Sequence, residues 1–146
     1  MHIVICGSLT FVREMDEMKE TLQSMGHTVV VPLGADLVRE GKVSLEQFET
    51  AKAAGQHYVL TTKQDAIRKH YNEIVSGDSI LVVNWDKKGV KGYIGGNTFL
   101  EMGFAHVLHK AIYVLHDLPD MPYADEMRAM QPVVLNGDVG RLIVKV

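Results

Sequence analysis

Short apolar runs, separated by polar or glycine-containing segments, recur along the chain. Each run is three to five residues long and most are rich in Val and Ile. Continuous apolar runs that are too short for a buried helix are typical of parallel strands covered on both faces. The pattern predicts strands at 3–6, 28–31, 79–83, 111–115, 133–135 and 142–144.

Several intervening segments have the spacing of amphipathic helices. Apolar residues recur three or four positions apart from Val12 to Met25, and Gly26 follows at the position of a helix C-cap. Another helix is predicted to begin at Thr61 or Thr62. Its inward face would consist of Ile67, Tyr71, Ile74 and Val75, and its outward ion pairs would join Lys69 to Asp65 and Glu73. Further helices are predicted at 98–108 and 123–130.

Residues 33–57 show only weak helical periodicity around Leu45 and Phe48, interrupted by Gly34, Gly41 and Gly55, and we expect a mobile excursion there. Elsewhere strands and helices alternate. This alternation predicts an α/β fold, with a small doubly wound parallel sheet of the Rossmann-like or flavodoxin-like kind flanked by helices. No internal repeat or linker divides the chain, so a single domain is expected over 1–146.

Composition excludes several classes of protein. A chain of 146 residues with 47% hydrophobic content suits one domain with its own core. Its net charge of −3 and scattered basic residues argue against binding to polymeric nucleic acid. Cys6 is the single cysteine and is interpreted as a buried, reduced thiol. No membrane-spanning stretch or leader is apparent, so we expect no membrane partner and a cytoplasmic location.

The residues that follow each predicted strand are candidates for ligand binding, because ligands of open α/β sheets bind beyond the carboxyl ends of the strands. Gly7 and Ser8 follow the first strand and precede a helix, so they are placed to hold a phosphate or a ribose oxygen. The alternative is that Ser8 or Thr10 caps the helix. Asn84 opens the polar loop after another strand and is a further candidate contact. The glycine patterns of dinucleotide-binding and Walker-type loops are absent.

A second helix entrance is formed by Gly95, Gly96 and Asn97, and Glu101 lies one turn further along. Glycines permit unusual backbone dihedral angles and close approach of a ligand. The positive end of the helix dipole favours an ionised carboxylate, which suits a nucleophile or a charge stabiliser. The alternative is a capping box, in which Glu101 hydrogen-bonds to the N–H of Thr98.

The segment 93–105, Tyr-Ile-Gly-Gly-Asn-Thr-Phe-Leu-Glu-Met-Gly-Phe-Ala, resembles the motif of the nucleoside 2-deoxyribosyltransferase-like superfamily, whose core is Glu-x-Gly-x-Ala. The order of elements is also similar, from a first strand ending in Cys-Gly-Ser to a helix that leads to Gly77-Asp78. The similarity covers residues 2 to 116. It implies that Glu101 attacks the anomeric carbon of a nucleoside and forms a glycosyl-enzyme intermediate.

The same resemblance implies further site residues. Relatives that hydrolyse deoxynucleoside monophosphates hold the phosphate at positions matching Ser8, Gly95, Gly96 and Asn97. The transferases differ, because they have an aspartate at the position of Gly95. The family uses an aspartate near the base and sugar eight residues before the strand-opening aspartate. Counting back from Asp78, which is itself a candidate substrate contact, gives His70.

A histidine at this position suits a proton donor to the leaving base, because its unperturbed pKa is near neutrality. The alternative is that His70 is a half-buried helix residue beside Tyr71. Asp65, Glu73 and Asp86 are other candidate acids.

These observations predict cleavage or transfer of an N-glycosidic bond in a nucleoside or nucleoside 5′-monophosphate, without a cofactor. The Gly-Gly-x-Thr-x-x-Glu pattern of 95–101 also resembles that of phosphoribohydrolases, which release a free base from a nucleoside monophosphate. This is a related variant of the same predicted activity. The alternative from another class is a non-catalytic module that binds or senses nucleotides. No metal is expected at His106 and His109, because a third ligand is lacking. The apolar helix at 98–108 predicts a homo-oligomer, a dimer or higher.

Overall fold

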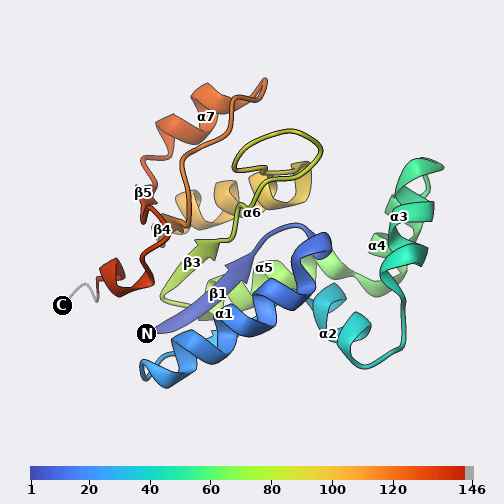
Figure 1. The fold of residues 1–146 in the computed structure, drawn as a ribbon, viewed down its shortest axis with the longest axis horizontal. Helices are drawn as coiled ribbons and strands as arrows, with labels where there is room; N and C mark the ends of the chain where they lie inside the picture. The colour runs from blue at the N-terminus through green and yellow to red at the C-terminus, as the bar shows by residue number, and fades with distance from the viewer. Residues whose placement is uncertain (144–146) are drawn as a thin grey trace.

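The computed structural model describes residues 1–143, apart from the side chains of Lys63 and Gln64, and contains one sheet of parallel strands (Figure 1). The order of the strands is β2-β1-β3-β4-β5, and each neighbouring pair is parallel. Flavodoxin-like doubly wound sheets have this order, so the predicted fold class is confirmed. The strands are β1 (His2–Cys6), β2 (Thr28–Val30), β3 (Ser79–Val82), β4 (Ala111–Val114) and β5 (Val133–Val134).

Helices connect the strands and cover both faces of the sheet (Figure 1). None of the helices within residues 1–143 is long and apolar enough to cross a membrane. The helices are α1 (Val12–Ser24), α2 (Leu33–Arg39), α3 (Leu45–Ala53), α4 (His57–Gln64), α5 (Ala66–Ser76), α6 (Gly96–Val107) and α7 (Ala124–Ala129), with short 3₁₀ turns at Leu9–Phe11 and Val139–Arg141.

Alternate side chains of β1 enter two separate cores, because successive residues of a strand point to opposite faces of the sheet. Ile3 and Ile5 pack in the core that includes the buried residues of α1. Val4 and Cys6 pack in the core formed with α5, α6 and α7. All four side chains are fully buried. Cys6, the last residue of β1, therefore lies on the face that α5 and α6 cover.

The region 33–57 contains α2, α3 and the first residue of α4, joined by short turns, where the sequence showed only weak helical periodicity. Within α3, Phe48 is the buried residue, so a helix of this length leaves little hydrophobic periodicity in the sequence. The start of α3 is fixed by a capping box, in which the Ser44 hydroxyl accepts from the Gln47 N–H at 3.1 Å and the Gln47 amide accepts from the Ser44 N–H at 2.8 Å. The expected mobility of this region stays a prediction.

The helix predicted to begin at Thr61 or Thr62 is divided in two. Asp65 has a φ of 50°, in the left-handed region, and separates α4 from α5. Both threonines consequently lie inside α4 rather than at a cap, and the prediction of the helix start was wrong.

The inward face predicted for this helix is only partly correct. Ile67 and Val75 are 45% and 43% exposed, whereas His70 and Ile74 are buried. His70 and Ile74 are four positions apart and share one face of α5, whereas Val75 is about 100° further round the helix and Ile67 lies in its first turn. Asp65 pairs with Arg68 at 3.8 Å instead of with Lys69, and no pair of Lys69 with Glu73 forms among the described side chains.

The strand predicted at 142–144 does not form at Leu142 and Ile143. These residues follow a 3₁₀ turn, and the carbonyl of Ile143 accepts a hydrogen bond from the Tyr113 hydroxyl at 2.8 Å instead of joining a sheet. Val144 lies outside the described residues. The strand predicted at 133–135 is confirmed as β5, which pairs with β4.

Asn84, just beyond β3, joins the loops that follow β3 and β4. Its side-chain amide nitrogen donates to the carbonyl oxygens of Gly92, His116 and Asp117 at 3.3, 3.1 and 3.0 Å. Its side-chain oxygen accepts from the His116 N–H at 2.9 Å. Because the residue is fully buried, these groups have no access to water as an alternative partner.

We predict that Asn84→Asp destabilises the protein by about 3 kcal/mol, because a carboxylate oxygen would face three carbonyl oxygens in place of the amide donor. Urea unfolding at pH 7 measures the change. Asn72→Asp, at an exposed position of α5, is the matched control and should shift the free energy of unfolding by less than about 0.5 kcal/mol. Equal effects of the two substitutions would show that the Asn84 contacts contribute nothing.

Candidate functional site

A cavity opens at the carboxyl edge of the sheet, where ligands of open α/β folds bind. Its walls come from the loops after β1 and β2, from α3 and α4, and from α5 and α6. Four residues that were predicted from the sequence line this cavity together, namely Gly7, His70, Asn97 and Glu101.

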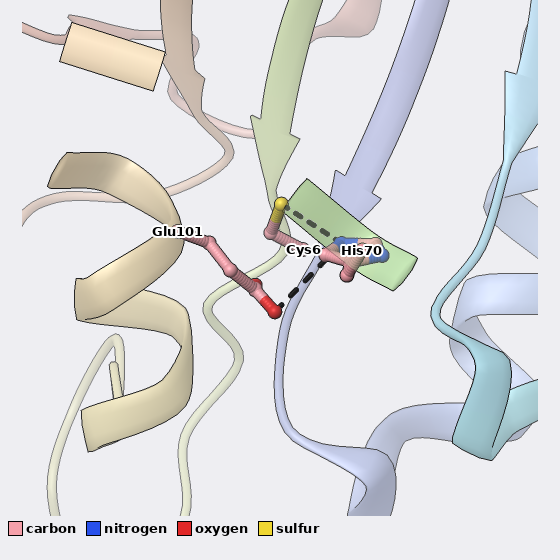
Figure 2. A group of neighbouring side chains, drawn as sticks. All are labelled: Cys6, His70 and Glu101. Atoms are coloured by element: carbon pink, nitrogen blue, oxygen red, sulfur yellow. Dashed lines mark hydrogen bonds and ion pairs between the residues drawn. The ribbon is translucent and has the colours of Figure 1, made fainter. Parts of the chain in front are cut away.

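Three polar side chains meet beside this cavity. Glu101 points from α6 toward the end of β1, where it meets His70 from α5 and Cys6 from β1 itself (Figure 2). The Nε2 atom of His70 lies 3.8 Å from Glu101 Oε1 and 3.4 Å from Cys6 Sγ. The side chains of His70 and Glu101 are 5% and 16% exposed. The sequence named His70 and Glu101 separately as candidate catalytic residues, and their side chains lie close together; it did not place Cys6 beside them.

Glu101 does not form the capping box that was the alternative to a chemical role. The helix begins two residues earlier than predicted, at Gly96, and Gly95 is its N-cap. Glu101 consequently lies beyond the first turn, out of reach of the N-cap N–H. Its carboxyl group is free to face His70 and the cavity.

Burial dominates the protonation of this cluster. It raises the pKa of Glu101 to about 8, although a hydrogen bond with Cys6 acts in the opposite direction. It lowers the pKa of His70 to about 4, although a hydrogen bond to the backbone of Ile5 opposes the change. Burial, and then the proximity of Glu101, raises the pKa of the Cys6 thiol well above its usual value. All three groups are therefore mainly uncharged at pH 7.

Two expectations from the sequence are corrected by this result. The helix dipole was expected to keep Glu101 ionised, but Glu101 lies past the first turn and desolvation outweighs the dipole. His70 was expected to keep a near-neutral pKa suited to a proton donor, but burial leaves a neutral imidazole at pH 7. Its alternative interpretation, as a half-buried helix residue beside Tyr71 and Ile74, agrees with its place on the buried face of α5, although His70 is more deeply buried than expected, at 5% exposed.

A second compartment adjoins the first and shares Gly7, Leu9, Phe48, His57 and Asn97 with it. It also contains the entrance of α6 at Gly95 and Gly96, together with Ser8 and three charged residues, Lys52, Lys87 and Glu49.

The amino groups of this second compartment are available to an anion. Lys87 Nζ donates to the Ser8 hydroxyl at 2.8 Å and lies 5.3 Å from the centre of the Tyr93 ring. Burial and the nearby charge of Lys52 lower the pKa of Lys87. Neither lysine lies within 4.0 Å of a carboxylate among the described side chains. Glu49 lines the same compartment, and its charge opposes the lowering of the Lys87 pKa. The two lysines outnumber this carboxylate and, with the N–H groups at the start of α6, form an environment that can bind an anion.

Ser8 does not cap a helix through its side chain, which was the alternative considered for it. Its hydroxyl donates to Thr10 Oγ1 at 3.3 Å and accepts from Lys87, and the cap of the following 3₁₀ turn has no side-chain hydrogen bond. Ser8 is therefore directed toward the second compartment.

The glycines of the site act through the absence of a side chain and not through unusual dihedral angles. Gly95 has a φ of −83°, and neither Gly95 nor Gly96 has a positive φ. A Cβ atom at Gly95 would lie 3.1 Å from the Tyr93 hydroxyl, whereas a Cβ at Gly96 would meet nothing within 4 Å. A Cβ at Gly7 would lie 2.7 Å from Val83 Cγ2 and 2.9 Å from Met15 Cε.

Some predicted site residues do not reach either compartment. Asp78 precedes β3, at the opposite edge of the sheet, and its carboxylate accepts from the His2 N–H at 2.6 Å. Asn84 is fully buried in the loop contacts described above. Asp86 accepts from the Gly92 N–H at 2.9 Å and borders a different hollow. Asp65 and Glu73 also lie outside the two linings.

Sequence reasoning missed several residues that line the compartments. Lys52 and His57 come from the region 33–57, which carried no legible pattern. Lys87 lies in the polar loop where Asp86 was considered instead. Cys6 was interpreted only as packing, and its position after three apolar residues gave no sign that α5 and α6 would bring polar groups to it.

No family model, curated protein or solved structure matches the chain. The resemblance of the segment 93–105 to the nucleoside 2-deoxyribosyltransferase-like superfamily therefore stays a hypothesis. The geometry of the two compartments is the independent basis for assigning a function.

We predict that Glu101→Gln removes a pH dependence of stability. Between pH 6.5 and 8 the folded wild-type protein keeps the Glu101 proton that the unfolded chain has lost, so its stability falls as pH rises toward the folded pKa of about 8. Below pH 6.5 the lowered pKa of His70 makes stability rise with pH instead, because His70 is protonated in the unfolded chain but not in the folded protein. The wild-type loss between pH 6.5 and 8 should be about 2 kcal/mol.

Urea unfolding at a series of pH values tests this expectation, and Glu20→Gln, at an exposed position of α1, is the matched control. The control should follow the wild-type curve, while the Glu101→Gln curve should be flatter. Parallel curves for wild type and Glu101→Gln would mean that Glu101 ionises normally in the folded protein.

Proposed function

We propose that the chain cleaves or transfers the N-glycosidic bond of a nucleoside 5′-monophosphate, with Glu101 as the nucleophile. The observation that carries the proposal is the position of Glu101, whose carboxyl group lines a cavity next to a compartment with two lysines and a helix N-terminus. A sugar bound between the two compartments would present its phosphate to the lysines and its anomeric carbon to Glu101. The resemblance of 93–105 to the superfamily supports the same assignment.

The reaction has two displacement steps. A Glu101 carboxylate oxygen attacks the anomeric carbon, the carbon–nitrogen bond breaks, and its electron pair leaves with the base, which gains a proton. Water then attacks the same carbon, the ester bond to Glu101 breaks, and the proton of the water is released. If a second base attacks instead of water, the result is transfer.

Glu101 must be ionised for the first step, and the buried site opposes this. With a pKa of about 8, only a minor fraction of the carboxyl group is ionised at pH 7. A desolvated carboxylate is correspondingly more nucleophilic, and partial positive charge on the anomeric carbon stabilises it during attack. His70, as a neutral imidazole 3.8 Å away, positions the carboxyl group and is not retained as the proton donor to the base.

The second compartment supports a phosphorylated substrate. Lys87, Ser8 and the first N–H groups of α6 are the kinds of group that bind phosphate oxygens, and they line one hollow. The adjoining cavity has apolar walls, including Leu100, Phe48 and Phe104, which suit a base or the carbon face of a sugar.

One observation favours a second function, that of a non-catalytic nucleotide-binding module. Glu101 is the sole carboxylate among the described residues that line the first cavity, whereas retaining glycosidases use two carboxylates about 5 Å apart. A module that only binds nucleotides would use the same lysines and helix entrance.

We predict that the wild-type protein releases a base from one or more members of a panel of ribo- and deoxyribonucleosides and their 5′-monophosphates, and that Glu101→Gln lowers kcat on the order of 10⁴-fold. Glutamine keeps the shape of the protonated side chain but cannot act as the nucleophile. Free base is measured by chromatography, and Glu20→Gln serves again as the control.

The outcomes separate the two functions. Equal base release by Glu101→Gln and wild type would exclude Glu101 as the nucleophile. If no compound is cleaved but nucleoside monophosphates raise the melting temperature, the binding-module function is the correct one.

We predict that Lys87→Met weakens recognition of a 5′-monophosphate about 10- to 100-fold, because one charge-assisted hydrogen bond to phosphate is lost. The corresponding nucleoside should bind equally to both proteins. The change is measured as KM in the base-release assay or as Kd by calorimetry. Lys91→Met is the matched control, since Lys91 belongs to the same loop but borders another hollow. Similar losses for the nucleoside would indicate a general disturbance of the loop.

A further inference from the structure

Cys6, His70 and Glu101 form a set of sulfur, nitrogen and oxygen atoms suited to a metal ion (Figure 2). One such atom from each residue lies within 4.8 Å of the other two. Around a tetrahedral zinc ion, bond lengths of about 2.0 to 2.3 Å place neighbouring ligand atoms about 3.4 to 3.6 Å apart. The observed distances of 3.4 Å from His70 Nε2 to Cys6 Sγ and 3.8 Å from His70 Nε2 to Glu101 Oε1 are close to these separations.

The formal charges of this set also suit a divalent ion. A thiolate, a carboxylate and a neutral imidazole together balance two positive charges, which matters in a site that excludes most water. Thiolate and imidazole ligands favour Zn²⁺ and Co²⁺ over Mg²⁺ and Ca²⁺, which prefer oxygen.

The three residues leave one coordination position directed to the cavity. His70 and Glu101 line that cavity, whereas Cys6 is fully buried behind them. Three protein ligands with a fourth, open position are the arrangement of zinc sites that accept a water molecule or another small ligand. The ligands come from β1, α5 and α6, three elements held together by a common core.

Other places in the described chain are poorer candidates. His106 and His109 are exposed, and Cys6, His70 and Glu101 are the one group of three or more such ligands found among the described residues. The cluster is therefore the place where a transition metal would bind.

We propose that Cys6, His70 and Glu101 bind one Zn²⁺ ion per chain, with the fourth ligand supplied from the cavity. This inference goes beyond the proposed function and does not depend on it. Its consequence for the site is inhibition, because a metal-bound Glu101 carboxylate is not available as a nucleophile. Activity would then require a metal-free site.

The test is a titration of the chelator-treated, full-length protein with Co²⁺, followed by displacement with Zn²⁺. A thiolate ligand gives a near-ultraviolet charge-transfer absorption, and tetrahedral Co²⁺ gives intense visible bands. We expect both signals to saturate at one Co²⁺ per chain and to disappear when Zn²⁺ is added. Mg²⁺ at the same concentration should displace nothing.

Two variants assign the ligands, and each is first checked for an unchanged circular dichroism spectrum. Cys6→Ala should abolish the charge-transfer absorption, and Glu101→Gln should weaken Co²⁺ binding by more than about 100-fold, since removal of a direct ligand costs more than loss of a group that only orients one. His106→Ala is the matched control and should leave binding unchanged.

The wild-type spectrum alone can overturn the inference. Absence of the charge-transfer absorption at millimolar Co²⁺ would mean that the cluster is only a buried hydrogen-bonded group. Binding that survives both Cys6→Ala and Glu101→Gln but is lost in His106→Ala would place the ion at the surface. Because the readout is metal binding and not base release, either result leaves the proposed function to be judged by its own assay.

Discussion

In the sheet, β1 is hydrogen-bonded to β2 on one side and to β3 on the other, and its side chains are covered by helices on both faces. This double coverage determines where the candidate site can lie. The alternation of the strand sends Cys6 toward α5 and α6, and the chain then turns at Gly7, where Val83 and Met15 leave no room for a side chain. Both compartments begin at this turn. The position of every other group in the site depends on how β1 ends.

Burial in this one place shifts the pKa values of three different side chains. The same low-dielectric surroundings hold a proton on Glu101, remove one from His70 and suppress ionisation of Cys6. The second compartment differs in charge, because Lys52, Lys87 and Glu49 border it together with backbone N–H groups. An uncharged pocket next to a cationic one is a suitable division for a molecule with an apolar end and an anionic end.

Much of the fold could be predicted from local sequence patterns. The candidate site residues in the segment that resembles a known motif could also be named from the sequence. The strong apolar runs predicted β1, β3 and β4, and the segment 93–105 identified Gly95, Gly96, Asn97 and Glu101. The sequence failed where an arrangement depends on contacts distant in the chain. His57 and Lys52 lie on short helices that bury few residues, so no periodicity revealed them. The start of α6 was misplaced by two residues, which made a capping box look plausible for Glu101.

Conservation of Gly7 and conservation of Gly96 among homologous sequences would have different causes. At Gly7, any larger residue collides with the core, so an invariant glycine there would follow from packing whether or not a ligand binds. At Gly96, a methyl group would meet nothing within 4 Å, and the backbone is helical, so the fold itself permits alanine. Invariance at Gly96 would consequently record a ligand that comes close to the backbone, and frequent replacement by alanine would indicate that nothing binds there.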